Sequence, residues 1–165
     1  CTSKALGGGL PLSAVIGKEN ILSEWSPTAY VSTQAANVLA CAAGNYVIDR
    51  ISSNNFLNDV NKSGNYLFKG LKELKTRHPI IGYLDNCGLY TGVELVRDKK
   101  TKEPADLEAN FVRDLCVQKG LLFEKGGYYH NRLQLIPALN IELKVIDKCI
   151  EILDFVFEKT RIKFK

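Results

Sequence analysis

The sequence predicts an α/β protein that ends in a small α+β unit. Two patterns support this prediction. A glycine-rich turn and a short apolar run are followed by two long helical segments, at 33–52 and 55–78. The remainder, 80–165, alternates between short strands and helices. Helices that pack on one face of a small, mostly antiparallel sheet form an α+β unit.

The composition is that of a globular protein. Of the 165 residues, 45% are hydrophobic and 24% are charged, and the net charge is +4. The lysines are spread along the chain without a dense basic block, so we expect no nucleic-acid partner. No apolar run approaches the roughly 20 residues of a membrane span. Two histidines and five irregularly spaced cysteines, without a C-x-x-C pair, predict no metal site and reduced thiols in the cytoplasm.

The opening segment carries the chemistry that stands out first. Lys4 precedes three glycines and Pro11, and the apolar run 12–16 is expected to form a short buried strand. Glycine lets the backbone adopt positive φ and approach another group closely. We therefore expect Lys4 at the mouth of a tight turn, where desolvation favours the neutral, nucleophilic amine. From this pattern alone, an ordinary solvated surface lysine is the alternative.

Three helical segments follow in the first half of the chain. Residues 18–25 predict a short helical turn, and 26–28 a break at Pro27. Thr33, or Ser32, is expected to cap the helix that runs to about residue 52. The next helix carries an apolar stripe, with Gly64 where another backbone could approach closely. That stripe consists of Leu57, Val60, Leu67, Leu71 and Leu74.

Pro79 follows this helix, and we expect a domain boundary there, with domains at 1–78 and 79–165. The second domain is expected to contain paired strands within 80–96, strands at 121–124 and 131–136, and helices at 106–119 and 141–159. Gly120 is expected to stop the first of these helices, and Gly126-Gly127 to form a turn. The expected inward residues are Leu107, Phe111, Val112 and Leu115 on one helix, and Val145, Cys149, Ile152 and Val156 on the other.

The segment Lys4-Ala-Leu-Gly-Gly-Gly-Leu-Pro-Leu-Ser-Ala-Val-Ile-Gly17 resembles the lysine segment of class III aminotransferases, the acetylornithine and 4-aminobutyrate type. These are pyridoxal 5'-phosphate (PLP) enzymes of fold type I. The resemblance implies that Lys4 binds PLP as a Schiff base. It also implies that 1–78 is the end of the large PLP-binding domain with its linking helix, and that 79–165 is the small C-terminal domain.

A second motif surrounds Thr33. Ser-Thr-Gln-Ala-Ala-Asn-Val-Leu-Ala-Cys-Ala-Ala, at 32–43, is similar to the family's Thr-x-Gly-Gly-Asn-Pro-x-Ala-Cys-Ala-Ala. In that pattern the threonine binds the PLP phosphate, typically in the active site of the other subunit, so the resemblance implies a homodimer with shared active sites. A helix N-terminus also favours an anion. From the residues alone, Thr33 as a plain N-cap is an even alternative.

The third motif contains the most informative departure from the family. Asn131-Arg-Leu-Gln-Leu-Ile-Pro-Ala-Leu139 is similar to Asn-x-x-Arg-x-x-Pro-Pro-Leu, in which the arginine binds the substrate carboxylate, and Gln134 occupies that position here. Glutamine carries no charge. Arg132 is expected on the same strand face, about 7 Å away, and supplies the guanidinium in one hypothesis. Ordinary strand polarity at both positions is the alternative.

The resemblance implies an aminotransferase that moves an amino group between an amino acid or amine and a 2-oxo acid through Lys4. An amino-acid racemase or epimerase of the same family is the alternative, and a non-catalytic fragment that only dimerises is another. In the family, the aspartate on the pyridine nitrogen and a phosphate-binding turn lie upstream of the lysine. We therefore expect the chain to be the C-terminal portion of a longer enzyme and to be inactive alone.

Overall fold

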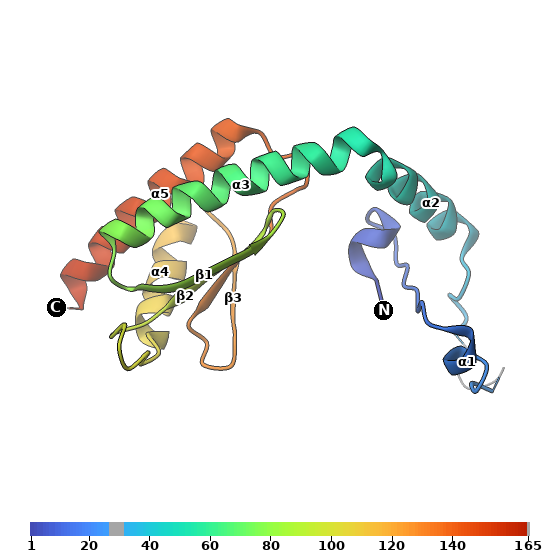
Figure 1. Ribbon diagram of the computed structural model, residues 1–165, viewed down its shortest axis with the longest axis horizontal. Coiled ribbons are helices and arrows are strands. Elements are labelled where there is room, and N and C mark those ends of the chain that lie inside the picture. Colours follow the sequence, from blue (N-terminus) through green and yellow to red (C-terminus); the bar gives the residue numbers. More distant parts are fainter. Residues whose placement is uncertain (27–31, 165) are drawn as a thin grey trace. The chain divides into compact units, whose positions relative to one another are not determined.

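The computed structural model describes residues 1–26 and 32–164 (Figure 1). These residues form two compact units, Cys1–Leu57 and Asn58–Lys165. The first contains a 3-10 helix, η1 (Lys4–Gly7), and the helices α1 (Glu19–Leu22) and α2 (Val38–Ser52). The long helix α3 (Asn54–Arg77) begins in the first unit and continues into the second. The boundary at Pro79, at the far end of α3, stays a prediction.

In the first unit, η1 packs on α2 through small residues. Ala40 and Gly44 of α2 are buried. A Cβ at Gly44 would lie 2.5 Å from a methyl group of Leu12 and 3.4 Å from the carbonyl oxygen of Leu6. The small side chains of α2 therefore allow the close packing that its alanine-rich sequence predicts.

Two predictions in this unit are wrong in detail. The apolar run 12–16 forms no strand: it makes one antiparallel bridge, between Thr2 and Ala14, and Ile16 is 83% exposed. A strand needs neighbouring strands to satisfy its backbone groups, and among the described residues only Thr2 pairs with this run. The short helical turn predicted at 18–25 is confirmed as helix α1. Of the break predicted at 26–28, residues 27 and 28 lie outside the described residues.

The other correction concerns the start of α2. The helix begins at Val38, not at Thr33, and ends at Ser52 as predicted. Its N-cap is Asn37, whose Oδ1 accepts a hydrogen bond from the backbone N–H of Ala40 at 3.1 Å. Ala36 has a left-handed φ of 53°, which interrupts any helix that starts earlier. Thr33 therefore lies in a turn that precedes the helix.

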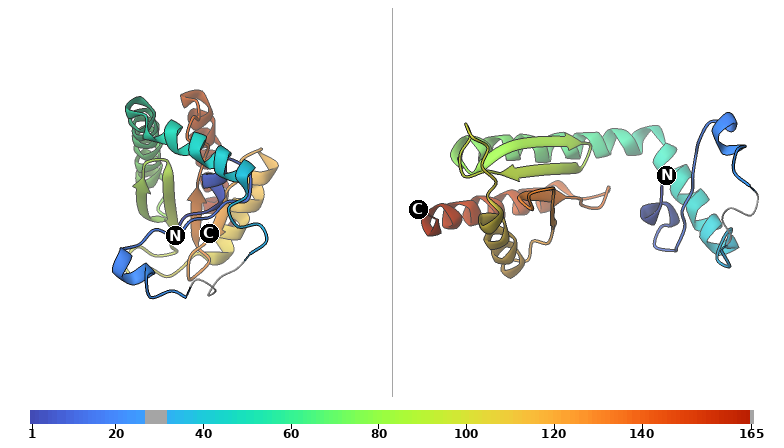
Figure 2. Two further views of the ribbon diagram at one scale, coloured as in Figure 1. Left: turned by 90° about the vertical axis from the view of Figure 1, so that its right-hand side faces the viewer. Right: turned by 90° about the horizontal axis from the view of Figure 1, so that it is seen from below.

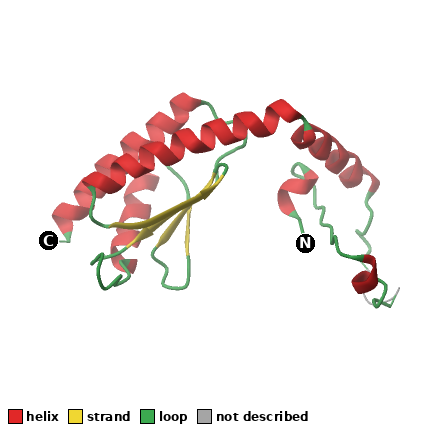
Figure 3. Cartoon of the chain, in the orientation of Figure 1, coloured by secondary structure: helices red, strands yellow, loops and turns green. Residues whose placement is uncertain are grey.

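The second unit is built on a four-stranded antiparallel sheet (Figure 3). The strand order is β1-β2-β4-β3, which confirms the predicted α+β unit. Its strands are β1 (Ile81–Cys87), β2 (Tyr90–Leu95), β3 (Glu124–Gly126) and β4 (Arg132–Leu135), and its helices besides α3 are α4 (Asp106–Gln118) and α5 (Leu143–Lys163).

Helices α3 and α5 run side by side in this unit (Figure 2), and the Tyr66 hydroxyl of α3 donates a 2.6 Å hydrogen bond to Asp147 of α5. The predicted stripe of α3 is buried from Val60 onward, whereas Leu57 is exposed. Gly64 of the same stripe lies against the backbone of Gly88, as the sequence predicts. The fully buried core joins α3, the sheet and α5 through Leu71, Leu74, Ile81, Val93, Leu133, Leu153 and Phe157.

The buried faces of α4 and α5 agree with the predicted ones only in part, at Val112 and Val156. Leu107 is 59% exposed, whereas Val112 is buried as predicted, together with Ala109 and Cys116. Val145 of α5 is 47% exposed. The buried row of α5 runs along Ile146, Leu153, Val156, Phe157 and Thr160. Both helices carry more than one apolar row, and the position of the sheet decides which row is covered.

The strand predicted at 121–124 begins only at Glu124 and continues to Gly126, because its pairing with β4 runs from Glu124 opposite Gln134 to Gly126 opposite Arg132. Gly120 ends α4 with a φ of 83°, as predicted. Within the described residues no helix is long and apolar enough to cross a membrane. The same residues contain no cluster of three metal-ligating side chains.

Candidate functional site

Lys4 occupies an uncommon backbone conformation. Its φ is 54°, in the left-handed region that costs a residue with a side chain about 1–3 kcal/mol. The 3-10 helix that it begins is capped by Gly8, with φ 59°, which is followed by Gly9, with φ 108°. Such strain concentrates at functional sites, which makes Lys4 a candidate on structural grounds as well as by sequence.

The loop that carries Lys4 is closed by backbone pairing and anchored by packing. Thr2 and Ala14 exchange two hydrogen bonds, of 2.9 and 2.8 Å. Gly7 is buried. A Cβ at this residue would lie 3.1 Å from the Cβ of Leu12. Lys4 itself is exposed, so the desolvation expected from the sequence does not occur within this unit.

Thr33 is also exposed, in the turn that precedes α2. The turn is held by Ser32, whose carbonyl oxygen accepts the backbone N–H of Ala35 at 3.0 Å. Lys4 and Thr33 thus both belong to the first unit and both present accessible polar groups.

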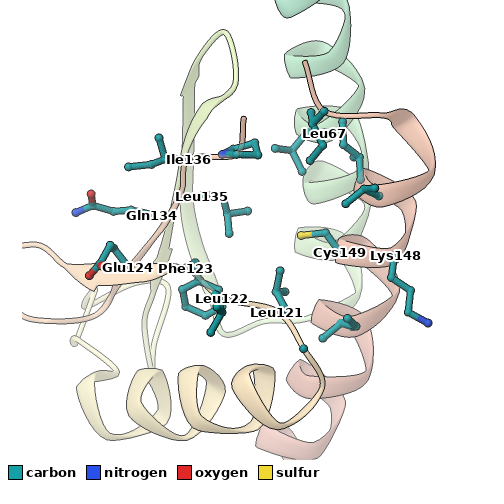
Figure 4. A pocket seen from close by; sticks show the side chains of 16 residues that line it. Leu67, Leu121, Leu122, Phe123, Glu124, Gln134, Leu135, Ile136, Lys148 and Cys149 are labelled. Carbon is teal, nitrogen blue, oxygen red and sulfur yellow. The ribbon is translucent and has the colours of Figure 1, made fainter. Parts of the chain in front are cut away.

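Arg132 and Gln134 belong to the second unit and share one face of β4. Their neighbours Leu133 and Leu135 are buried on the opposite face. Figure 4 shows this alternation: Leu135 points toward α3 and α5, whereas Gln134 points to the other side of the strand. We call the side that carries Gln134 the outer face. By strand register it also carries Asp85, Gly92, Glu94, Glu124 and Gly126.

The side chain of Arg132 crosses β2 and reaches β1. Its Nη2 donates a hydrogen bond of 2.6 Å to Oδ1 of Asp85. Between the two strands lies Gly92, and a Cβ at that position would collide with the guanidinium of Arg132. The ion pair therefore depends on the absence of a side chain at residue 92.

Gln134 leans the other way, toward β3. A Cβ at Gly126 would lie 2.9 Å from its Nε2, and its Oε1 accepts a hydrogen bond of 3.3 Å from the hydroxyl of Tyr90. Two glycines thus make room for the two polar side chains of β4. The amide of Gln134 offers a neutral hydrogen-bonding group where a charged one is expected in the family.

A groove of about 580 Å³ opens beside this strand, between the sheet and α5 (Figure 4). Its walls are largely apolar and include Leu67, Phe123, Leu135 and Cys149. Burial raises the pKa of the Cys149 thiol to about 11. The row Val145, Cys149 and Ile152, which the sequence predicts as a buried stripe, lines this groove instead.

A second charge cluster joins α3 to α5 and is structural. His78 is buried, and its Nε2 lies 2.5 Å from Oδ1 of Asp154, which also pairs with Arg77. Burial alone would raise the pKa of Asp154, but the hydrogen bonds with His78 and Arg77 outweigh it and hold that pKa below its usual value. The ionised carboxylate therefore links the end of one helix to the middle of the other.

The structure adds three residues that the sequence reasoning missed: Asp85, Tyr90 and Gly92. All three lie on the β1–β2 hairpin, whose strands are joined by the two-residue loop Gly88-Leu89. A two-residue loop fixes the register of its hairpin. That signal, read together with the alternation along β4, could have identified Asp85 and Gly92 as neighbours of the polar pair.

Comparison with known proteins gives a consistent result. The model of the family "Aminotransferase class-III" matches residues 1–157. Alanine–glyoxylate aminotransferase 2 homolog 2, mitochondrial, of Arabidopsis thaliana is 33% identical over 157 residues, which cover 95% of this chain and 33% of that protein. Leucine/methionine racemase of Thermococcus litoralis is 36% identical over 154 residues, covering 92% of this chain and 34% of that one.

A solved structure extends the likeness to three dimensions. The transaminase from the marine bacterium Virgibacillus matches with a TM-score of 0.77 and 25% identity, over 88% of this chain and 34% of that chain. The chain thus spans about a third of the length of the relatives it matches. The predicted fold, part of the α/β fold of these transferases, is confirmed. The chain belongs to the class III aminotransferase family.

Proposed function

We propose that this chain supplies the cofactor lysine and part of the substrate face of a PLP-dependent aminotransferase. The observation that carries the proposal is Lys4: a non-glycine residue with a left-handed φ of 54°, in a glycine-rich turn, within a family match that begins at residue 1. The enzyme would move an amino group between an amino acid or amine and a 2-oxo acid. A protein of the relatives' length is expected to be needed for activity, and this chain alone to be inactive.

The residues of the first unit fit PLP. The cofactor needs a primary amine for its aldehyde and hydrogen-bond donors for its phosphate, and Lys4 and Thr33 offer these groups in exposed positions. Lys4 would hold the cofactor covalently through Nζ. When bound, PLP supplies an electron sink for negative charge at the substrate Cα.

Lys4 would also move the proton. As a free and neutral amine, its Nζ would accept the proton from the substrate Cα as a general base. In amino transfer the resulting ammonium group of Lys4 would then give up the same proton again. Since one amine both receives and returns the proton, replacing Lys4 removes binding and proton transfer together.

Thr33 would bind the phosphate across a homodimer interface, with its hydroxyl as the donor. Exposed apolar side chains on α2 support burial of this helix by further protein: Val38, Leu39, Tyr46 and Ile48. Such a set on one short helix is typical of a surface that another segment or subunit covers. The cytoplasm is the proposed location, because five unpaired cysteines fit a reducing compartment.

A racemase or epimerase is the second candidate, and the 36% identity to the leucine/methionine racemase favours keeping it. A racemase returns the proton to Cα from the opposite face. To separate the two, the full-length protein is incubated with single-enantiomer amino acids in D₂O, with and without a 2-oxo acid. Keto product that depends on the 2-oxo acid supports amino transfer, whereas deuterated racemate without an acceptor contradicts it.

The third candidate, a fragment that only dimerises, is tested with the chain itself. PLP is added to the chain and to the full-length protein, and the cofactor's absorbance in the bound form is recorded for each. Bound cofactor in the full-length protein alone supports the enzyme proposal. Dimerisation without bound cofactor in either protein supports the non-catalytic alternative.

A further inference from the structure

We propose that Asp85 is a specificity-determining residue, which selects against substrate carboxylates by holding Arg132 against the sheet. The inference deepens the proposed function and rests on it, because it takes the outer face of the sheet to be the face that meets the substrate. It names the substrate class: amino donors whose group at this position is neutral rather than a carboxylate.

The first step is that Arg132 is already occupied. Its Nη2 donates to Oδ1 of Asp85 at 2.6 Å, and its side chain is only 22% exposed, whereas that of Asp85 is 43% exposed. A guanidinium binds a carboxylate best as a bidentate pair with a free fork of N–H groups. Asp85 already takes one of these N–H groups and competes with any substrate carboxylate for the rest.

The second step is that the backbone reserves room for this arrangement. A Cβ at Gly92 would collide with Nη2 and Cζ of Arg132, and it would lie 2.5 Å from Oδ1 of Asp85. The ion pair between Arg132 and Asp85 therefore crosses β2 at Gly92, where no side chain stands in its way. Any side chain at this position would displace Arg132.

The third step is the charge of the outer face. Among the described residues, the strand register places one basic side chain there, Arg132, together with three acidic ones, Asp85, Glu94 and Glu124. Gln134 is neutral and accepts a hydrogen bond from Tyr90. A carboxylate substrate would meet a paired arginine and two further negative charges, whereas an amine with an uncharged alkyl group in place of the carboxylate would meet no such repulsion.

The test uses the full-length protein and two amino donors of equal length, 4-aminobutanoate and butylamine, with a common 2-oxo acid. The measured quantity is the ratio of kcat/KM for 4-aminobutanoate to kcat/KM for butylamine. We expect Asp85→Asn to raise this ratio about tenfold or more, because it releases a guanidinium that can form a charge-assisted hydrogen bond. In the Arg132→Gln background, Asp85→Asn is expected to raise it far less.

Glu124→Gln is the matched control, because it removes one negative charge from the same face, on the strand next to Gln134. A change in the ratio equal to that of Asp85→Asn would show a general charge effect and overturn the inference. So would a gain by Asp85→Asn that persists in the Arg132→Gln background. Gly92→Ala provides a second route, because it displaces Arg132 without a change of charge and is expected to raise the ratio as well.

The outcomes for the two proposals are distinguishable. Amino transfer with an unchanged ratio in both Asp85→Asn and Gly92→Ala overturns the inference and leaves the proposed function intact. A wild-type preference for 4-aminobutanoate over butylamine also overturns it. Absence of amino transfer from either donor, together with absence of PLP on Lys4, overturns both.

Discussion

Gly64 of α3 and Gly88 of the β1–β2 turn lie in direct backbone contact. A Cβ at Gly64 would collide with the carbonyl group of Gly88 and would lie 3.1 Å from its Cα. Gly88 itself has a φ of 57°, so both residues are glycines for separate physical reasons. This contact fixes the end of the hairpin against the helix, and the hairpin in turn carries Asp85 and Tyr90 on its strands.

Gly64→Ala is therefore expected to lower the free energy of unfolding by about 1–3 kcal/mol, because the backbone of Gly88 must move. In an unhindered helix the same change would be stabilising by nearly 1 kcal/mol. Gly70→Ala is the matched control in the same helix, since its Cβ would meet only the flexible side chain of Ile150, at 3.0 Å. Urea unfolding of the two variants measures the difference, and equal midpoints would contradict the contact.

Asp154→Asn is expected to destabilise the chain by about 1 kcal/mol near neutral pH, a value reduced for partial exposure of the carboxylate. Because the folded pKa of Asp154 is below its unfolded value, the stabilisation is present above that unfolded value and is lost as the pH falls through the folded pKa. Unfolding between pH 6 and pH 2 should thus show a shallower loss of stability in Asp154→Asn than in the wild type.

The exposed pair of Asp59 and Lys62 provides the control for that experiment. Asp59→Asn is expected to leave the pH dependence nearly as in the wild type, since both side chains are solvated. If the two variants lose stability with the same slope, Asp154 does not link α3 to α5 in the way described.

The five cysteines are expected to differ in their reaction with iodoacetamide. Burial raises the pKa of Cys149 to about 11, and burial together with the nearby Cys149 raises that of Cys116 to about 12. At pH 8 only about one Cys149 thiol in a thousand is ionised. Peptide mapping over time should show Cys1 and Cys87, which are exposed, labelled first and Cys116 last. Early labelling of Cys116 in the native chain would contradict its burial.

Local patterns in the sequence predicted the elements whose partners are close in the chain. The stripe of α3, the β1–β2 hairpin and the glycine stop of α4 follow from spacing and turn chemistry alone. The prediction of a strand at 12–16 is wrong because a strand needs neighbouring strands to satisfy its backbone hydrogen bonds. The one bridge of this run is to Thr2. On α5 two adjacent rows are apolar, and only packing against the sheet decides that Ile146 and Leu153 are buried while Val145 and Cys149 line the groove.

The candidate site divides in the same way. Motifs predict Lys4, Thr33, Arg132 and Gln134 as site residues, because each lies within a contiguous segment. The ion pair joins Arg132 of β4 to Asp85 of β1, which are 47 residues apart in the sequence. It also depends on Gly92 of β2, which lies between these two strands. Such a relationship is set by strand register and by the diagonal lean of a long side chain, which no local pattern encodes.

The most direct test of the account is to locate the cofactor on the chain. The full-length protein is incubated with PLP, reduced with borohydride, digested and analysed by peptide mass spectrometry, with Lys4→Arg and Lys18→Arg as the paired variants. The account predicts the reduced cofactor on Lys4 in the wild type and in Lys18→Arg, and none in Lys4→Arg. Cofactor on another lysine, or retained after Lys4→Arg, would contradict it.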